Sequence, residues 1–314
     1  MIDFDIVITI DIFSHPGESS TQISGVFFPV LKHFMKDKST AEITEDYYNS
    51  KDANYFYQNI WSPDFTHVGT YKDEDVSIEE ASIAMIKRMV RLLPRIKKST
   101  KFLDLGSGYG GAARFIAETY ECSITCVNIS ETQNEINNKL NKEAGLDEKI
   151  TVVKANFEEL PFQRDSFDLV WSQDAFLHSD HKDLIFREVS RVINNEGRFI
   201  FTDFIKNEDS PKEVLQPILE RLQLKDLGTF KQYDRLARSV DMAKVYNKDM
   251  PEMMIIHYKK VLEKLKAEYS SITKKASQKY IDDMMKGLQN WIDGAEAGHI
   301  SWALFQYQKK KVWI

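Results

Sequence analysis

Two things are largely missing from this 314-residue sequence: long apolar runs and basic residues near its start. No apolar run approaches the roughly 20 residues that a membrane-spanning helix needs, so we expect no membrane partner. The first Lys or Arg is Lys32, and Asp3, Asp5 and Asp11 precede it. Such an N-terminus lacks the positive flank of a signal peptide and is too acidic for an ordinary transit peptide. We therefore expect a cytoplasmic protein.

Cysteine is also scarce, with only Cys122 and Cys126 in the chain. They lie four residues apart on one predicted strand, so their side chains point the same way. Because a disulfide within one strand has poor geometry, we expect both residues to be reduced and buried in the core, as is usual in the cytosol. No metal site is predicted.

An excess of positive charge is absent as well. The chain has 48 acidic and 42 basic residues, a formal net charge of -6, and the two signs are interspersed. This pattern excludes the basic stripe of a typical nucleic-acid surface and favours a small-molecule partner. With 42% apolar and 29% charged residues, the chain can build one large domain, or one domain with an inserted cap, around a substantial core.

What the sequence does contain is a glycine-rich turn at residues 106–111, between a short apolar strand at 101–105 and an Ala-rich helix that reaches about residue 118. Glycines are needed where a ligand approaches bare backbone, and the helix directs its N–H groups at the turn. Gly106, Gly108 and Gly111 also satisfy the G-x-G-x-x-G pattern of dinucleotide sites. Asp104 argues against that interpretation, because a carboxylate repels a pyrophosphate but attracts the ammonium group of an amino-acid ligand. A strand-turn-helix without a ligand is the remaining alternative.

Strand and helix patterns alternate along most of the chain, which is typical of an α/β fold with a mostly parallel sheet. Further strands are predicted at 123–128, 150–154, 166–171, 197–204, 241–247 and 302–308. Helices are predicted at 130–144, 182–194, 215–224, 233–240, 251–269 and 278–296. Ligands of such folds bind beyond the carboxyl ends of the strands. Polar side chains follow three of these ends, at Asn128, at Asn156 and within residues 172–178.

The N-terminal part has two patterns of its own. Residues 2–12 alternate apolar and polar side chains and predict an appended edge strand or arm. Residues 43–82 are dense in aromatic side chains. Core packing explains some of these rings, but many carry a hydroxyl or a ring nitrogen, which is costly in a dry core, and a segment that folds over a cationic ligand needs such rings. Ser77 and Glu80 form a capping box that starts a helix, and Pro94 ends it.

Several motifs resemble one group of enzymes. Residues 103–110, LDLGSGYG, resemble motif I of the Rossmann-like S-adenosylmethionine (SAM) methyltransferases. Residues 47–48, 56–61, 67–71 and 77–82, together with WSQDAFLH at 171–178, resemble the sarcosine/dimethylglycine N-methyltransferases. Phosphoethanolamine N-methyltransferases are similar around 174–178, and residues 128–133 resemble the group that contains tocopherol and cyclopropane-fatty-acid methyltransferases. The resemblance spans residues 47–309.

This resemblance implies the architecture. It implies a Rossmann-like α/β fold with a mostly parallel seven-stranded sheet whose last strand is antiparallel, flanking helices, an N-terminal aromatic segment and a helical lid. It also implies an N-terminal extension at 1–42 and a methyltransferase domain at 43–314. Within that domain we expect a cap at 43–95 and lid insertions at about 205–240 and 250–297. We expect a monomer or a homodimer.

The resemblance also implies a SAM site. The family commonly has acidic residues for the ribose and for the adenine amino group, where this chain has Asn128, paired with Gln133, and Asn156; an amide can make the same hydrogen bonds without the charge. Phe157 is implied to lie against the adenine ring. The implied cofactor-binding residues are Asp104, Gly106, Ser107, Gly108, Gly110, Asn128, Ile129, Gln133, Asn156, Phe157, Ser172, Gln173, Trp61 and Gly69. The implied catalytic residues are Asp174, His178 and Tyr48.

The implied reaction is methylation of sarcosine and N,N-dimethylglycine to give glycine betaine, an osmoprotectant, by in-line attack of a neutral amine. A dimethylamine has a pKa of about 10 by analogy with lysine, and a dry aromatic pocket favours loss of its proton. Asp174 and His178 are the candidate proton acceptors. The acceptor's carboxylate requires an arginine, a tyrosine hydroxyl or backbone N–H groups, and the sequence does not identify the arginine.

Other functions stay open at this point. A phosphoethanolamine or other small-molecule, tocopherol-like methyltransferase is one, although a phosphate substrate needs clustered basic residues near the lid, and the sequence shows none that dense. A SAM-binding module without turnover is another, and the two acid-to-amide changes allow it. Asp104 and Asn128 argue against an NAD-dependent oxidoreductase. The motifs N-P-P-Y and D-P-P-Y are absent, which disfavours a methyltransferase acting on nucleic-acid bases.

Overall fold

The computed structural model describes residues 38–311, so the edge strand predicted at 2–12 lies outside the described residues. Ser39–Ile314 form one compact unit. A seven-stranded sheet organises this unit, in the order β3-β2-β1-β4-β5-β7-β6. Its strands are β1 Lys101–Leu105, β2 Ser123–Asn128, β3 Ile150–Lys154, β4 Phe167–Gln173, β5 Ile193–Lys206, β6 Met242–Asp249 and β7 Ile300–Lys309.

The direction of the strands confirms the predicted fold class. Strands β1 to β5 pair in parallel, whereas β7 is antiparallel to both of its neighbours, β5 and β6. The strand order reverses between β1 and β4, so these two strands flank the point at which open α/β sheets bind their ligands. The fold therefore fixes the place of the site before any side chain is considered.

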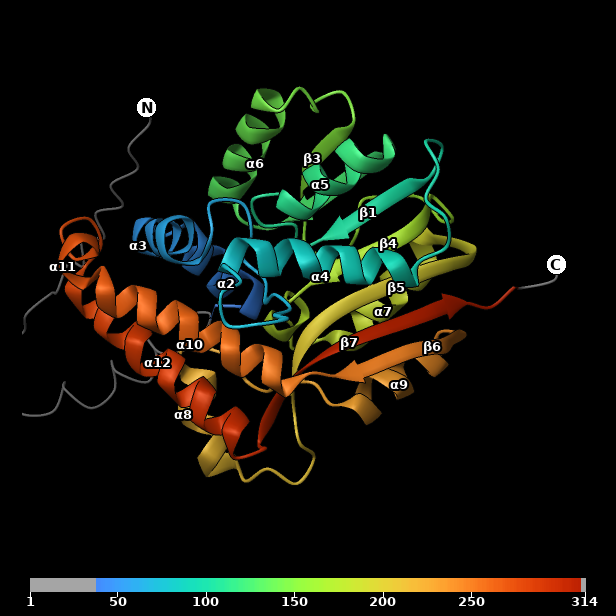
Figure 1. Cartoon of the computed structure of the whole chain (residues 1–314). Helices are drawn as coiled ribbons and strands as arrows, with labels where there is room; N and C mark the ends of the chain where they lie inside the picture. The colour runs from blue at the N-terminus through green and yellow to red at the C-terminus, as the bar shows by residue number, and fades with distance from the viewer. Residues whose placement is uncertain (1–37, 312–314) are drawn as a thin grey trace, which may run out of the picture. The chain divides into compact units, whose positions relative to one another are not determined.

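Helices cover both faces of this sheet (Figure 1). One face packs against α4 Ile78–Leu92, α5 Gly111–Tyr120, α6 Glu131–Glu143 and α10 Pro251–Ala267, and the other against α7 Lys182–Val192 and α9 Phe230–Ser239. Successive strand residues point to opposite faces: Phe102 belongs to the first core and Leu103 to the second. Asp104 follows the period of Phe102 and therefore points toward the face that carries α5.

The first part of the aromatic N-terminal segment is helical, and residues 62–77 connect it to α4 without a helix. The helical part consists of α2 Thr40–Asn49, α3 Lys51–Phe56 and a π-helical turn, η1, at Tyr57–Trp61. The predicted capping box is confirmed, because the Glu80 amide donates to Ser77 Oγ at 3.2 Å and the Ser77 amide donates to Glu80 Oε2 at 3.0 Å. Helix α4 ends at Leu92, and Leu93 is extended, as expected for a residue that precedes proline.

The C-terminal half adds α8 Lys212–Glu220, α11 Tyr269–Ile272 and α12 Gln278–Glu296. Helices α10 and α12 lie side by side (Figure 1), and α12 also packs against α8. Several predicted bounds were a few residues wrong. Two of them are shifts of four residues, at the end of α8, which is Glu220 and not 224, and at the start of β5, which is Ile193 and not 197. Ile193 already pairs with Phe167 ahead of a bulge, so α7 stops at Val192 and not at 194.

Two further expectations concern burial. Cys122 and Cys126 are both free and buried, as predicted, although Cys122 precedes β2. Among residues 38–311, no helix combines the length and the apolar character that crossing a bilayer requires.

Candidate active site

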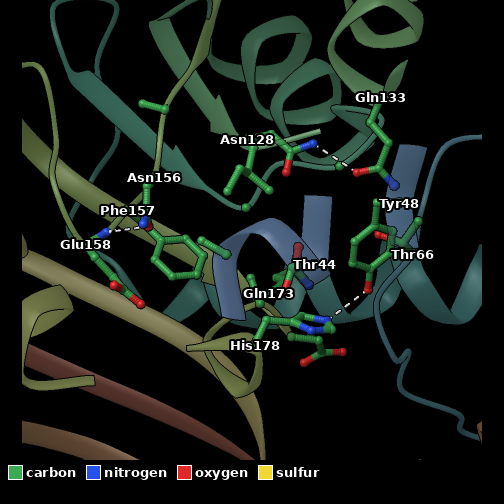
Figure 2. Close-up of a pocket in the computed structure, with 17 residues that line it drawn as sticks. Thr44, Tyr48, Thr66, Asn128, Gln133, Asn156, Phe157, Glu158, Gln173 and His178 are labelled. Atoms are coloured by element: carbon green, nitrogen blue, oxygen red, sulfur yellow. Dashed lines mark hydrogen bonds between the residues drawn. The ribbon is translucent and has the colours of Figure 1, made fainter. Parts of the chain in front are cut away.

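A cavity of about 680 Å³, including the part open to solvent, lies at the carboxyl ends of β1 to β4. Residues after each of these strands line it, and α2 contributes Thr44 and Tyr48 from the opposite side (Figure 2). Parallel strands end at one edge of a sheet, which is why residues from four separate stretches of sequence meet here.

The glycine-rich turn has the backbone that its sequence predicts. Gly106 and Gly110 have φ of +72° and +77°, in the left-handed region that a side chain disfavours. The amides of Gly106 and Ser107 donate to the Val127 carbonyl at 2.7 and 3.1 Å. The turn is thus tied to the end of β2. Gly106 and Gly108 line the main cavity, Ser107 lines the hollow beside it, and Gly110 caps α5 outside both.

Asp104 lies in that adjoining hollow with Gly106, Ser107 and His67. It is only 4% exposed, and burial raises its pKa to about 7. Within the described part of the chain its carboxylate has no hydrogen-bond or ion-pair partner. A desolvated carboxylate without a partner is unfavourable until a cation arrives. The sequence analysis predicted that Asp104 binds an ammonium group. Its burial without a partner among the described residues is the environment that such binding needs.

Two amides sit together at the end of β2. Asn128 Nδ2 donates to Gln133 Oε1 at 2.9 Å, and both residues line the cavity with Ile129 (Figure 2). Ser130 caps α6 by accepting from the Gln133 amide, which fixes Gln133 one turn into the helix. The pair presents both amide donors and amide oxygens, the groups that bind hydroxyls in either direction.

At the end of β3, Asn156 and Phe157 also line the cavity. Asn156 Oδ1 accepts the Glu158 amide at 2.9 Å, so one of its two lone pairs is already used. The Phe157 ring packs edge-to-face on Phe176, with ring centroids 5.5 Å apart, which holds it in place as a flat apolar wall. Glu158 lines the cavity too, a residue that the sequence analysis did not assign.

The end of β4 brings Gln173, Asp174 and His178 to the cavity, but not Ser172. The Ser172 hydroxyl is fully buried and donates to the Leu105 carbonyl at 2.7 Å. It joins β4 to β1 behind the site and does not line it. The predicted contact of Ser172 with a cofactor therefore has no support from its position.

Asp174 is held by three donors. Its Oδ2 accepts the Val68 amide at 2.8 Å, and its Oδ1 accepts the Thr202 hydroxyl and the Trp302 indole N–H, each at 2.6 Å. Burial raises its pKa to about 6, against the opposing effect of these hydrogen bonds. Asp174 also has φ of +54°, an unfavourable conformation for a residue with a side chain. The surrounding groups thus fix this carboxylate in one orientation.

His178 and Tyr48 are in contact at the cavity wall. The Tyr48 hydroxyl lies 3.0 Å from His178 Nε2, and the two rings meet edge-to-face (Figure 2). Burial lowers the pKa of His178 to about 3, and the positive charges of Arg221 and Lys182 act in the same direction. The imidazole is therefore neutral at physiological pH. The three residues predicted as catalytic, Asp174, His178 and Tyr48, do converge on one wall.

Trp61 and Gly69 do not line the cavity. Trp61 packs in the core, with its ring centroid 4.8 Å from that of His257, and its indole N–H donates to the His67 carbonyl. Gly69 packs so closely on the backbone of Ala81 that a Cβ would overlap it. These two residues had been assigned from the resemblance, and packing of the aromatic segment on α4 and α10 explains their places.

Sequence reasoning missed a second group of side chains beside the cavity. The hydroxyl of Tyr47 lies 3.4 Å from that of Tyr57 and 3.3 Å from that of Tyr280, and Arg221 Nη2 donates to the Tyr258 hydroxyl at 3.1 Å. We call Tyr47, Tyr57, Tyr258 and Tyr280 the tyrosine cluster. They come from four helical elements and span more than two hundred residues, so no local pattern could have grouped them with Arg221.

Among residues 38–311 no three His, Cys, Asp or Glu side chains are arranged to hold a metal ion.

Comparisons with known proteins agree with this geometry. The family model described as "Methyltransferase domain" matches residues 103–201. The sarcosine/dimethylglycine N-methyltransferase of Halorhodospira halochloris is 38% identical over 273 residues, covering 87% of this chain and 98% of that protein. The enzyme of the same name from Aphanothece halophytica is 37% identical over 274 residues, covering 87% and 99%. A crystal structure of a proposed sarcosine dimethylglycine methyltransferase from Galdieria sulphuraria superposes with a TM-score of 0.80 at 36% identity, covering 85% of this chain and 100% of that one.

Proposed function

The chain belongs to the sarcosine/dimethylglycine N-methyltransferase family, and we propose that it methylates sarcosine and N,N-dimethylglycine with SAM, giving glycine betaine. The observation that carries this proposal is Asp104, a buried carboxylate that has no partner among residues 38–311 and lies at the edge of a cavity formed at the switch point of the sheet. An amino-acid ammonium group is the cation that such a position accepts. The same cavity supplies amides for a ribose and a ring for a base.

The residues present fit SAM. We assign the ammonium group to Asp104, the ribose to Asn128 and Gln133, and the adenine to Asn156 and Phe157. SAM supplies a methyl group on a positively charged sulfur, which an amine lone pair can attack. The glycine turn and the three donors on Asp174 act before the reaction, by fixing the walls of the site so that little reorganisation is needed.

The amine must be neutral when it attacks. His178 is a poor acceptor for its proton, because burial lowers the pKa of the imidazole to about 3. Asp174 is also a weak acceptor, because burial raises the pKa of its carboxyl only to about 6, far below the pKa of about 10 of the amine, and both of its oxygens already accept hydrogen bonds. We therefore assign Asp174, His178 and Tyr48 to orienting the amine. The low dielectric of the pocket selects its neutral form.

The surrounding helices complete the proposal. Residues 43–95 act as a cap and the segment at about 250–297 as a lid, because they carry the aromatic side chains that exclude water from the site. The lid expected at about 205–240 is limited to its first part, because α9 packs on the opposite face of the sheet with α7. We propose a cytoplasmic enzyme, monomeric or homodimeric, with a small amine as its acceptor. These assignments rest on the family and on the placement of the helices.

The test is an acceptor panel with methyl-labelled SAM. Purified protein is incubated with glycine, sarcosine, N,N-dimethylglycine, phosphoethanolamine and a tocopherol precursor. Label in N,N-dimethylglycine and glycine betaine is the expected result. Label only in phosphoethanolamine or the tocopherol precursor would reject the proposed acceptor. Calorimetric binding of S-adenosylhomocysteine (SAH) without any labelled product would instead indicate a binding module.

A further inference from the structure

Arg221 directly follows α8, and its guanidinium lies between residues of α10 and α12. The guanidinium lies over the rings of Tyr258 and Trp291, 5.6 and 5.2 Å from their centroids. Nη2 donates to the Tyr258 hydroxyl, and Nη1 lies 3.4 Å from the Met284 sulfur. Nε is inaccessible to solvent and has no hydrogen-bond partner in the described part of the chain. The guanidinium thus meets rings, a thioether and one hydroxyl, but no group that compensates its charge.

No carboxylate of the described residues forms an ion pair with Arg221. Glu220 and Asp283 line the hollow next to it, yet Asp283 pairs with Lys279 at 2.5 Å. Taking an arginine out of water is costly unless an anion and further hydrogen bonds replace the water. The hydroxyls of Tyr47 and Tyr280 line the same hollow and can donate such hydrogen bonds.

Helix α12 is shaped around this arginine. Gly287 lies in the interior of the helix, where glycine costs about 1 kcal/mol relative to alanine. A Cβ at this position would lie 2.6 Å from Arg221 Cγ, a contact too short for any side chain. The glycine therefore leaves room for the stem of Arg221, which indicates that the position of the guanidinium matters.

The arginine is within electrostatic reach of the cavity. Tyr47, whose hydroxyl belongs to the tyrosine cluster, is followed by Tyr48, whose hydroxyl contacts His178 in the cavity. The charge of Arg221 contributes to lowering the pKa of His178 and opposes the rise in the pKa of Tyr48. Tyr48 and His178 form one wall of the cavity. Arg221 and the tyrosine cluster thus lie behind this wall, among the helices.

We propose that Arg221, with hydroxyls of the tyrosine cluster, binds the carboxylate of the acceptor and so selects N-methylated glycines over amines that lack a carboxylate. This inference rests on the proposed function, because it places the amine end of the same molecule beside Tyr48 and His178. A guanidinium binds a carboxylate through two parallel hydrogen bonds, and phenolic hydroxyls can donate to the remaining lone pairs. The acceptor is thereby held at both ends.

The test compares three variants with the wild type. Arg221→Met keeps the apolar stem and removes the charge, and Arg221→Lys keeps the charge and removes the planar fork. Arg198→Met is the matched control: Arg198 is also half-buried with guanidinium nitrogens that lack partners, but it pairs with Leu169 near the amino end of β4, away from the site. The readouts are KM and kcat for N,N-dimethylglycine and for N,N-dimethylethanolamine, and SAH affinity by calorimetry.

We expect Arg221→Met to raise KM for N,N-dimethylglycine by about 30-fold, the loss typical of hydrogen bonds to a charged group, with SAH affinity unchanged within threefold. Arg221→Lys should raise it less, and Arg198→Met should not move it. The preference for N,N-dimethylglycine over N,N-dimethylethanolamine should nearly vanish in Arg221→Met. A wild-type KM in a variant that still binds SAH would overturn the proposal.

A measurement on the unmodified enzyme covers the case in which the variants do not fold. The neutral amide of N,N-dimethylglycine should show a KM at least 30-fold above that of the acid, and equal values would refute a carboxylate site. If the wild type forms no product from sarcosine or N,N-dimethylglycine, the proposed function fails and this inference with it. If the wild type forms product and Arg221→Met has an unchanged KM, the proposed function stands and only the role of Arg221 is rejected.

Discussion

The Val68 amide donates to Asp174 Oδ2 at 2.8 Å. This hydrogen bond joins the aromatic segment that precedes α4 to the end of β4, 106 positions further along the chain. Thr202 on β5 and Trp302 on β7 donate to the other oxygen of the same carboxylate. Asp174 therefore connects the cap to three strands of the sheet beside the site, and its charge state affects both stability and the shape of the site.

Asp174→Asn should loosen this connection. The amide nitrogen of asparagine would face a donor, leaving a buried group unsatisfied, so we expect the free energy of unfolding to fall by about 1–3 kcal/mol, with faster hydrogen exchange at the Val68 amide and a lower kcat. Asp168→Asn is the control, because Asp168 lies at the other end of β4 and its carboxylate accepts two hydrogen bonds, from Lys101 and Asn194. It should cost stability without lowering kcat. Unchanged exchange at Val68 in Asp174→Asn would contradict this role.

SAH affinity should depend on pH through Asp104. Burial raises the pKa of its carboxyl to about 7 in the free protein, whereas the ligand ammonium favours the ionised form, so binding releases a proton. Affinity should be constant well above pH 7 and fall by about tenfold for each pH unit below it. Calorimetry between pH 5.5 and 8.5 checks this. Asp104→Asn should bind more weakly and lose the pH dependence, and a dependence that survives the substitution would assign it to another group.

The pH dependence of turnover should report the acceptor and not His178. If only the neutral amine reacts, kcat/KM for N,N-dimethylglycine rises about tenfold per pH unit up to the pKa of the amine, near 10. No inflection that depends on His178 is expected near 6.5, because the pKa of His178 is about 3 and its imidazole is neutral throughout. His178→Gln should keep the same slope. An inflection near 6.5 that His178→Gln abolishes would restore the histidine as a base.

Tyr48→Phe removes the hydroxyl that lies 3.0 Å from His178 Nε2. One neutral hydrogen bond contributes about 0.5–1.5 kcal/mol, so a fall in kcat of about tenfold is expected, with SAH affinity unchanged. Tyr307→Phe is a matched control, since it deletes a hydroxyl that bonds Asp234 on the far side of the sheet. If Tyr307→Phe lowered kcat equally, the effect would be a general loss of stability and not a role of Tyr48 in the site.

Much of the fold could be predicted because its signals are local. The glycines at 106–110 require a left-handed backbone, Ser77 and Glu80 cap their own helix, and the residue before Pro94 cannot continue that helix. Each of these signals acts within a few residues. The prediction that Asn128, Asn156 and Asp174 meet depended on one more rule, that parallel strands end at a common edge, and the sheet obeys it.

Several of the residues assigned from the resemblance do not line the cavity. Ser172 bonds the Leu105 carbonyl behind the site, and Trp61 and Gly69 pack around His257. The sequence pattern provided no independent support for cofactor contacts by Trp61 and Gly69. The aromatic residues of this segment do not recur at a helical or strand period, so the sequence does not specify which rings point toward the sheet. Packing against α4 and α10 decides that, and it also decides that Tyr48 lines the cavity.

The sequence by itself determined the class of the fold, the glycine turn and the acidic and amide residues at the strand ends, because these depend on backbone dihedrals, on periodicity and on the common edge of a parallel sheet. Only the tertiary structure decided that Asp174 holds Val68, that Asp104 has no partner among the described residues, and that Arg221 meets Tyr258. These features join segments that are tens to hundreds of residues apart. Burial and long-range packing create them, and neither can be obtained from neighbours in the chain.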